Sequence, residues 1–131
     1  MRRVIGLALL LGAAPVAAAD LVAPEFAARV SGRTIAWSTA DGRLHGMEQY
    51  LPGGAVIWRF PGETCMQGRW QGVGTRICFT YDGLPGTQCW HFAESADALT
   101  ALAEGAPEEE RLVATGESRV PLACPGPWLG S

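Results

Sequence analysis

Cysteine is the most reactive side chain in this sequence, and three of its four cysteines fall in one short stretch. Cys78 and Cys89 lie near Asp82 and His91, residue types that can serve a thiol nucleophile as orienting acid and base. A nucleophile needs a free thiolate, however. The cysteine count is even and the N-terminus has the pattern of an export signal, so we predict paired sulfurs, which do not attack.

Four cysteines allow three pairings. We expect Cys78–Cys89 with Cys65–Cys124, because a four-residue loop at Asp82–Pro85 places Cys78 opposite Cys89 in a hairpin. A two-residue turn in the preceding hairpin leaves Cys65 out of register with Cys78, and thus free to tether the tail through Cys124. The rival pairing is Cys65–Cys78 with Cys89–Cys124. A C-x2-C spacing, the usual sign of a structural zinc site, does not occur.

Two further sets of residues have the chemical types found in a metal site or in a glycosidase active site, but not the sequence spacing typical of such sites. Soft metals such as copper bind imidazole and thioether groups. The sequence offers four of these: His45, Met47, Met66 and His91. Glycoside hydrolysis needs two carboxyl groups about 5–10 Å apart. Its candidates are Glu48, Glu63 and Asp82. Neither set follows a local sequence motif. A small hydrolase or a soft-metal-binding protein is therefore only the alternative function. We assign no catalytic residue, metal or cofactor.

Arginine is the polar residue with the most consistent placement. Arg59, Arg69 and Arg76 alternate with the aromatic residues of their own expected strands, and His91 does the same. Side by side on adjacent strands, they would form a cationic patch suited to a carboxylate, an acidic glycan or an acidic partner. The alternative is an ordinary polar sheet face paired with acids. This face predicts a non-enzymatic module that binds a partner protein or a cell-envelope component.

The elements that must position these residues are strands. Apolar and polar residues alternate with period two between Gly and Pro turns, which is typical of a half-buried antiparallel sheet. Gly72-Val73 fits a two-residue turn. The expected strands are 33–38, 43–51, 55–60, 65–71, 76–81, 87–92 and 111–115. We predict a mainly β fold of six or seven strands, a meander that curls toward a barrel.

Side-chain parity predicts which residues this sheet buries. The aromatic residues share one face, so we expect four of them to be buried: Trp58, Trp70, Phe79 and Trp90. Arg69 and Arg76 should be exposed on the other face.

Two segments have helical patterns. Ser95 has the residue type of an N-cap, Leu99 and Leu102 follow at helical spacing, and Gly105 can end the helix, so we expect a helix near 95–104. A shorter helical segment, one or two turns long, is expected between Pro24 and Gly32.

Residues 1–19 have the pattern of a secretory signal peptide. Arg2 and Arg3 precede an apolar run that is too short to span a bilayer, and small residues precede Asp20, where we expect cleavage. Removing 19 of the 131 residues leaves 112, enough for one domain with a Pro-rich C-terminal tail. We therefore predict a periplasmic or secreted protein with no stable membrane insertion after cleavage.

The charge of the chain narrows its partners. Without the two signal arginines, eight arginines face 13 acidic residues, a net charge of −5. An acidic chain without a basic cluster argues against nucleic acids and anionic membrane surfaces as partners. The expected partner is a protein or an envelope ligand.

The pattern Trp70…Ile77-Cys78-Phe79…Cys89-Trp90 resembles small exported β-rich proteins of uncharacterised proteobacterial families. The resemblance covers Gly68–Phe92. It implies the β-rich fold, supports the Cys78–Cys89 pairing and supplies no catalytic residues.

Overall fold

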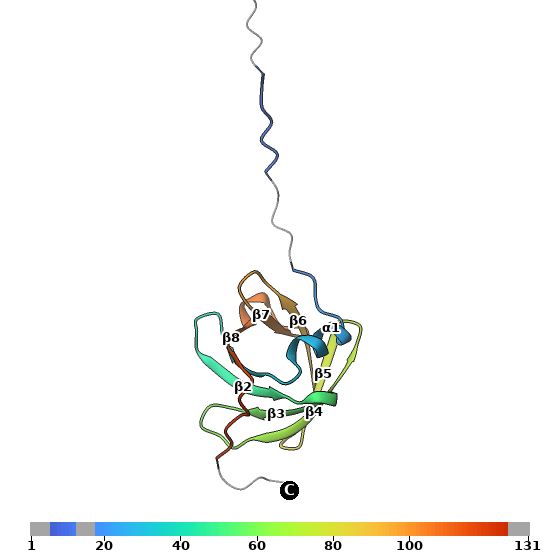
Figure 1. Ribbon diagram of the computed structural model, residues 1–131, viewed down its shortest axis with the longest axis vertical. Coiled ribbons are helices and arrows are strands. Elements are labelled where there is room, and N and C mark those ends of the chain that lie inside the picture. Colours follow the sequence, from blue (N-terminus) through green and yellow to red (C-terminus); the bar gives the residue numbers. More distant parts are fainter. Residues whose placement is uncertain (1–5, 13–17, 126–131) are drawn as a thin grey trace, which may run out of the picture.

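The chain folds into a closed barrel of eight antiparallel strands. The computed structural model describes residues 6–12 and 18–125. Each strand pairs with its neighbours in the sequence, and the last returns to the first (Figure 1). The strands are β1 (Thr34–Ser38), β2 (Leu44–Tyr50), β3 (Ala55–Arg59), β4 (Met66–Val73), β5 (Arg76–Tyr81), β6 (Leu84–Glu94), β7 (Leu99–Ala103) and β8 (Leu112–Ser118). The predicted meander of six or seven strands is therefore wrong in its strand count, and the sheet closes completely.

In the part of the chain that the structure describes, three helical elements accompany the strands. The helix α1 (Ala23–Val30) precedes β1, and the short 3-10 helices η1 (Pro52–Gly54) and η2 (Glu108–Glu110) lie in connections. No helix within the described residues is long and apolar enough to cross a membrane.

Helix α1 closes one end of the barrel. Its first amide, at Ala23, donates to the carbonyl of Gly74 in the β4–β5 turn (2.9 Å), and the amide of Gly32 just after it donates to the carbonyl of Tyr50 at the end of β2 (2.8 Å). The helix thus runs across the barrel end. Phe26 and Val30, one turn apart, are fully buried beneath it.

Local sequence explains this helix. Pro24 lies in its first turn, where its missing N–H has no intrahelical acceptor in any case. The Glu25 side chain accepts a hydrogen bond from the Val22 amide (3.0 Å), as in a capping box. Gly32, with a φ of 75°, takes the left-handed conformation just after the helix. The short helical segment expected in this region is confirmed.

The helix predicted near 95–104 is wrong. Residues Leu99–Ala103 form β7, which pairs with β6 from Trp90↔Ala103 to Glu94↔Leu99. Ser95 caps a turn rather than a helix, because its hydroxyl donates to the Ala98 carbonyl (2.8 Å). Leu99 and Leu102 fit a helical pattern, but Leu99 and Ala101 fit an alternating one equally well. Strand pairing on both sides, which also completes the barrel, favours the strand.

The two central hairpins differ from prediction in their turns. The turn of the first is Gly74-Thr75, since Val73 pairs with Arg76. The turn of the second is the two residues between Tyr81 and Leu84, and an irregularity farther along places two extra residues on β6. These extra residues restore the register expected from a four-residue loop. Cys78 therefore pairs with Cys89 even though the predicted loop was wrong.

Both predicted disulfides are confirmed. Cys78–Cys89 joins directly paired residues of β5 and β6, and Cys65–Cys124 ties the C-terminal segment to the start of β4. Sulfur pairing leaves no free cysteine within the described chain, so the thiol nucleophile is excluded there. The first disulfide follows from strand register. The second fastens a segment outside the barrel, where Leu122 is buried and its amide donates to Gln49 Oε1 (3.0 Å).

The predicted sheet faces are largely confirmed. Trp58 and Phe79 are buried in the barrel, and Trp70 and Trp90 face inward but are half-buried. Arg69 and Arg76 are exposed outside. Within the predicted signal peptide, Arg2 and Arg3 lie outside the described residues. In its apolar run, Leu7 and Leu9 to Leu11 are all exposed, so these leucines contribute nothing to the core.

Candidate functional site

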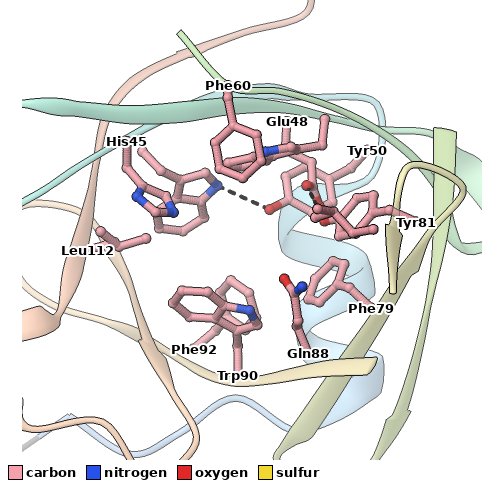
Figure 2. A pocket seen from close by; sticks show the side chains of 13 residues that line it. His45, Glu48, Tyr50, Phe60, Phe79, Tyr81, Gln88, Trp90, Phe92 and Leu112 are labelled. Carbon is pink, nitrogen blue, oxygen red and sulfur yellow. Dashed lines mark hydrogen bonds between the residues drawn. The ribbon is translucent and has the colours of Figure 1, made fainter. Parts of the chain in front are cut away.

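The barrel interior is not completely filled. Opposite the end that α1 closes, a pocket opens to solvent. The space between its walls is about 460 Å³ when the open mouth is included, and the part that the centre of a water molecule can reach is about 60 Å³. Figure 2 shows inward-pointing side chains surrounding this space, with α1 behind it. Its lining comes from six strands or their flanks: Trp37, His45, Glu48, Tyr50, Trp58, Phe60, Phe79, Tyr81, Leu84, Gln88, Trp90, Phe92 and Leu112. Such a concave, mostly aromatic space is typical of a small-ligand site.

The floor of the pocket is an aromatic cluster built on the helix. The Phe26 ring of α1 lies 4.3 Å from that of Phe92 and 5.8 Å from that of Tyr50, measured between ring centroids. The Trp37 indole donates to the Tyr50 hydroxyl (3.2 Å), which gives each of these buried polar groups a hydrogen-bond partner. This packing makes the floor rigid and leaves the free volume toward the open end.

A missing side chain shapes one wall. Gly46 faces inward on β2, and a Cβ atom there would overlap the six-membered ring of the Trp58 indole. The indole therefore lies flat over the β2 backbone. A larger residue at this position would push the ring into the pocket.

One acidic group lies inside this aromatic space. Glu48 faces inward on β2 and is 2% exposed, and its Oε2 accepts a hydrogen bond from the Tyr81 hydroxyl of β5 (2.6 Å) (Figure 2). Burial raises the pKa of Glu48 to about 8, while the hydrogen bond from Tyr81 acts in the opposite direction. The Glu48 carboxyl is thus mostly protonated at neutral pH. Burial and the nearby Glu48 also raise the pKa of Tyr81, so its hydroxyl keeps its proton.

His45 lies at the pocket mouth. Its ring contacts those of Trp58 and Phe60 at centroid distances of 5.7 and 6.1 Å. Burial, and to a smaller extent the charge of Arg43, lower the pKa of His45, so the neutral imidazole is favoured at pH 7. Regular alternation along the strand would place His45 on the face opposite Tyr50. An irregularity in the β1–β2 pairing, where Trp37 pairs with Gly46 but Ser38 with Leu44, leaves His45 unpaired and able to turn inward.

The arginine face predicted from sequence lies outside the barrel and is dispersed. Ala55 pairs with Arg69, and Arg59 lies four residues farther along β3, or about 13 Å at the usual strand rise. Val73 pairs with Arg76, which sets Arg76 a similar distance from Arg69 in the other direction. The strand register therefore does not bring the three arginines side by side.

Each arginine of this face has its own local partner. Arg59 donates to the Ala123 carbonyl, and Arg69 donates to the carbonyl of Gly53 (3.3 Å). Arg76 forms an exposed ion pair with Glu104 (2.6 Å). The Nδ1 atom of His91 lies 3.5 Å from the carboxylate of Asp20. These contacts resemble the ordinary polar surface of a sheet, which was the alternative interpretation.

The structure also separates the soft-metal candidates. His45 and Met66 line or pack against the interior, whereas Met47 contacts Arg59 and His91 contacts Asp20 on the outside. Among the described residues, no group of three or more His, Cys, Asp and Glu side chains has a geometry that could hold a metal ion. This arrangement does not favour the soft-metal hypothesis.

The carboxylate candidates are separated too. Glu48 is buried in the barrel, while Glu63 and Asp82 are exposed in loops. The structure therefore does not assemble the pair that a glycosidase would use.

Sequence reasoning missed the interior pocket and the burial of Glu48 in its wall. One signal was available. Glu48 has the same parity as Gly46 and Tyr50 in its strand, so it occupies a position that should face the core. A charged residue type at an inward position is either paired or functional.

Comparison with known proteins adds no assignment, since no protein-family model, curated protein or solved structure matches the chain.

Proposed function

We propose that this chain is an exported, non-enzymatic binding protein that takes a small, largely apolar ligand of the cell envelope or its surroundings into the barrel. One observation carries the proposal: the interior of a closed eight-stranded barrel is left open at one end and walled by aromatic rings. Barrels of eight strands have room for side chains or for one small ligand. Here the helix fills one end of the interior, and the other end is left for a ligand.

Export is the second part of the proposal. Two disulfides favour an oxidising compartment. The apolar run in residues 1–19, whose described leucines are exposed, supports a cleavable signal. Compared with the sequence-based hypothesis, binding moves from the outer arginine face to the interior, and an envelope component remains the expected ligand.

A mouth-closing substitution tests the proposal. Gln88 faces inward beside the opening and is exposed, so Gln88→Trp should obstruct the pocket without altering the buried core. Gln67→Trp is the matched control, because Gln67 is exposed on the outer face of β4. The probe is N-phenyl-1-naphthylamine, an uncharged dye whose fluorescence rises in apolar surroundings, excited in its own absorption band.

We expect saturable dye binding by the wild-type protein and by Gln67→Trp, and affinity at least about tenfold weaker for Gln88→Trp. Charge reversal at both Arg69 and Arg76 should leave dye affinity unchanged, since neither residue lines the pocket. Equal binding by the two tryptophan variants, or no saturable binding by the wild type, would exclude the interior as the ligand site.

A further inference from the structure

The pocket holds a buried acid without a buried base. Glu48 is 2% exposed, and the hydrogen bond described for it comes from a neutral phenol, Tyr81. Its partners across β1 and β3 are Ile35 and Trp58, neither of which is charged. A buried carboxylate is costly unless a cation accompanies it, and in the free protein Glu48 avoids this cost by keeping its proton. Only a ligand that brings a positive charge would favour its ionised form.

The described arginines do not supply that cation. None of them lines the pocket. Arg59 and Arg69 bond to backbone carbonyls outside the barrel, and Arg111 pairs with Glu108 of η2. His45, at the mouth, is the one basic side chain among the lining residues, and the neutral form of its ring is favoured. A positive charge close to Glu48 would therefore have to arrive with the ligand.

The aromatic walls suit the same charge. The faces of Trp and Tyr rings attract an ammonium group within about 6 Å, more strongly when water is excluded. Trp37, Tyr50 and Trp58 line the space that Glu48 also lines. One carboxyl group among aromatic rings provides both an ion-pair partner and a cation–π surface. An anionic ligand would find neither.

We propose that the pocket selects organic amines: a protonated amino group on a small apolar or aromatic body, with the ammonium held by Glu48 and the surrounding rings. This inference rests on the proposed function, because it names the ligand class of the same pocket. The apolar body occupies the aromatic space toward the mouth. The Tyr81 hydroxyl orients the Glu48 carboxylate by donating to Oε2.

Proton balance follows from this geometry. The titratable groups that share the pocket with Glu48 are Tyr50, Tyr81 and, at the mouth, His45. Both tyrosines stay protonated, because burial raises the pKa of each. When the ammonium enters, Glu48 releases its proton to solvent, and the complex holds one carboxylate and one ammonium. Affinity for the amine should thus increase about tenfold per pH unit below pH 8 and level off above it.

The experiment is calorimetric titration with three probes of one shape: 2-phenylethylamine, 2-phenylethanol and phenylacetate. At pH 8 we expect the amine to bind at least about tenfold more tightly than the alcohol, and phenylacetate to bind more weakly than either. From pH 6 to pH 8 the amine affinity should rise by more than about tenfold, with proton release in buffers of different ionisation enthalpy. The alcohol should not show this increase.

Two variants identify the group responsible. Glu48→Gln retains the shape of the side chain and an acceptor for Tyr81, so it should lower amine affinity at least about tenfold and leave alcohol affinity within about threefold. Glu63→Gln, at an exposed loop acid, should change neither. If Glu48→Gln does not fold, the pH dependence of amine binding to the wild type still decides the matter.

Failure of this inference is distinguishable from failure of the proposed function. Equal or weaker binding of the amine relative to the alcohol, together with dye binding that Gln88→Trp weakens at least about tenfold, would overturn the amine preference and leave the interior ligand site intact. If the dye and all three probes fail to bind the wild type, both proposals are overturned. Amine binding that is independent of pH and of Glu48→Gln would also overturn the assignment to Glu48.

Discussion

Replacing Glu48 by Gln should change how the stability of this protein depends on pH. In the unfolded chain the carboxyl group titrates near its ordinary pKa of 4.5, whereas burial raises the pKa to about 8 in the folded protein. Between these values the folded state retains a proton that the unfolded state has lost. The contribution of Glu48 to the free energy of unfolding is therefore fully present below pH 4.5 and falls as the pH rises toward 8.

The size of the effect follows from these two pKa values. A raised carboxyl pKa reduces the free energy of unfolding by about 1.4 kcal/mol per pH unit within the window. Between pH 6 and pH 8 the slope weakens as the folded pKa is approached, and the total loss is about 2 kcal/mol. Gln cannot titrate, but it can still accept the hydrogen bond from Tyr81. From pH 6 to pH 8, Glu48→Gln should therefore gain about 2 kcal/mol of stability relative to the wild type.

Urea denaturation followed by tryptophan fluorescence measures this difference at pH 6, 7 and 8, with the disulfides intact and constant ionic strength. The urea dependence of the unfolding free energy should be the same for both proteins, so that midpoints can be compared. His45, whose pKa burial lowers, contributes in the opposite direction below its ordinary value of 6.5, but equally in both proteins. Parallel pH profiles for the wild type and Glu48→Gln would refute the reasoning. Glu63→Gln is the control, and its profile should follow the wild type.

The packing, the second disulfide and the cleavage site each lead to a further prediction. Gly46→Ala should destabilise the fold by about 1–3 kcal/mol, because the new methyl group overlaps an indole ring. Gly116→Ala, with its nearest neighbour at 3.6 Å, should be nearly neutral, and urea midpoints of the two variants test the difference. Replacing both Cys65 and Cys124 by Ala should lower the free energy of unfolding by about 4 kcal/mol in the same assay, because the disulfide closes a loop with a sequence separation of 59. A smaller loss than that caused by removing the Cys78–Cys89 disulfide would contradict this loop-entropy explanation. The exported protein should begin at Asp20 by intact mass, and retention of the leader in the exported form would contradict the proposed cleavage.

Strand parity made much of the barrel predictable. The alternation around Cys78 and Cys89 indicated which side chains face inward and which sulfurs can meet, and these features are found in the structure. The alternation of side chains between the two faces follows from the extended backbone alone. An error in the predicted turn therefore leaves the paired residues unchanged when extra residues elsewhere in the hairpin compensate for it. The second hairpin illustrates this, because a tighter turn and two extra residues on β6 leave the same cysteine pair in register.

Local patterns could not decide the state of residues 99–103. Leu99 and Leu102 fit one face of a helix, and Leu99 and Ala101 fit one face of a strand. The strand forms because β6 and β8 both offer backbone partners to it. These partners are distant features of the closed sheet, and no window of sequence contains them.

The sequence by itself determined the residue faces, the short helix before the first strand and the chemical types available for a site. Only the tertiary structure decided that the sheet closes, that α1 blocks one end, and that inward positions near the other end border free space instead of core. The physical reason is that parity assigns a side chain to a face, while free volume depends on how all eight strands and the helix fill the interior. Glu48 has the same side-chain parity as Gly46 and Tyr50, so it faces inward wherever its strand pairs in an antiparallel sheet. The closed barrel then buries its carboxyl group at the wall of the pocket, beside the Tyr81 hydroxyl and away from the outer arginines.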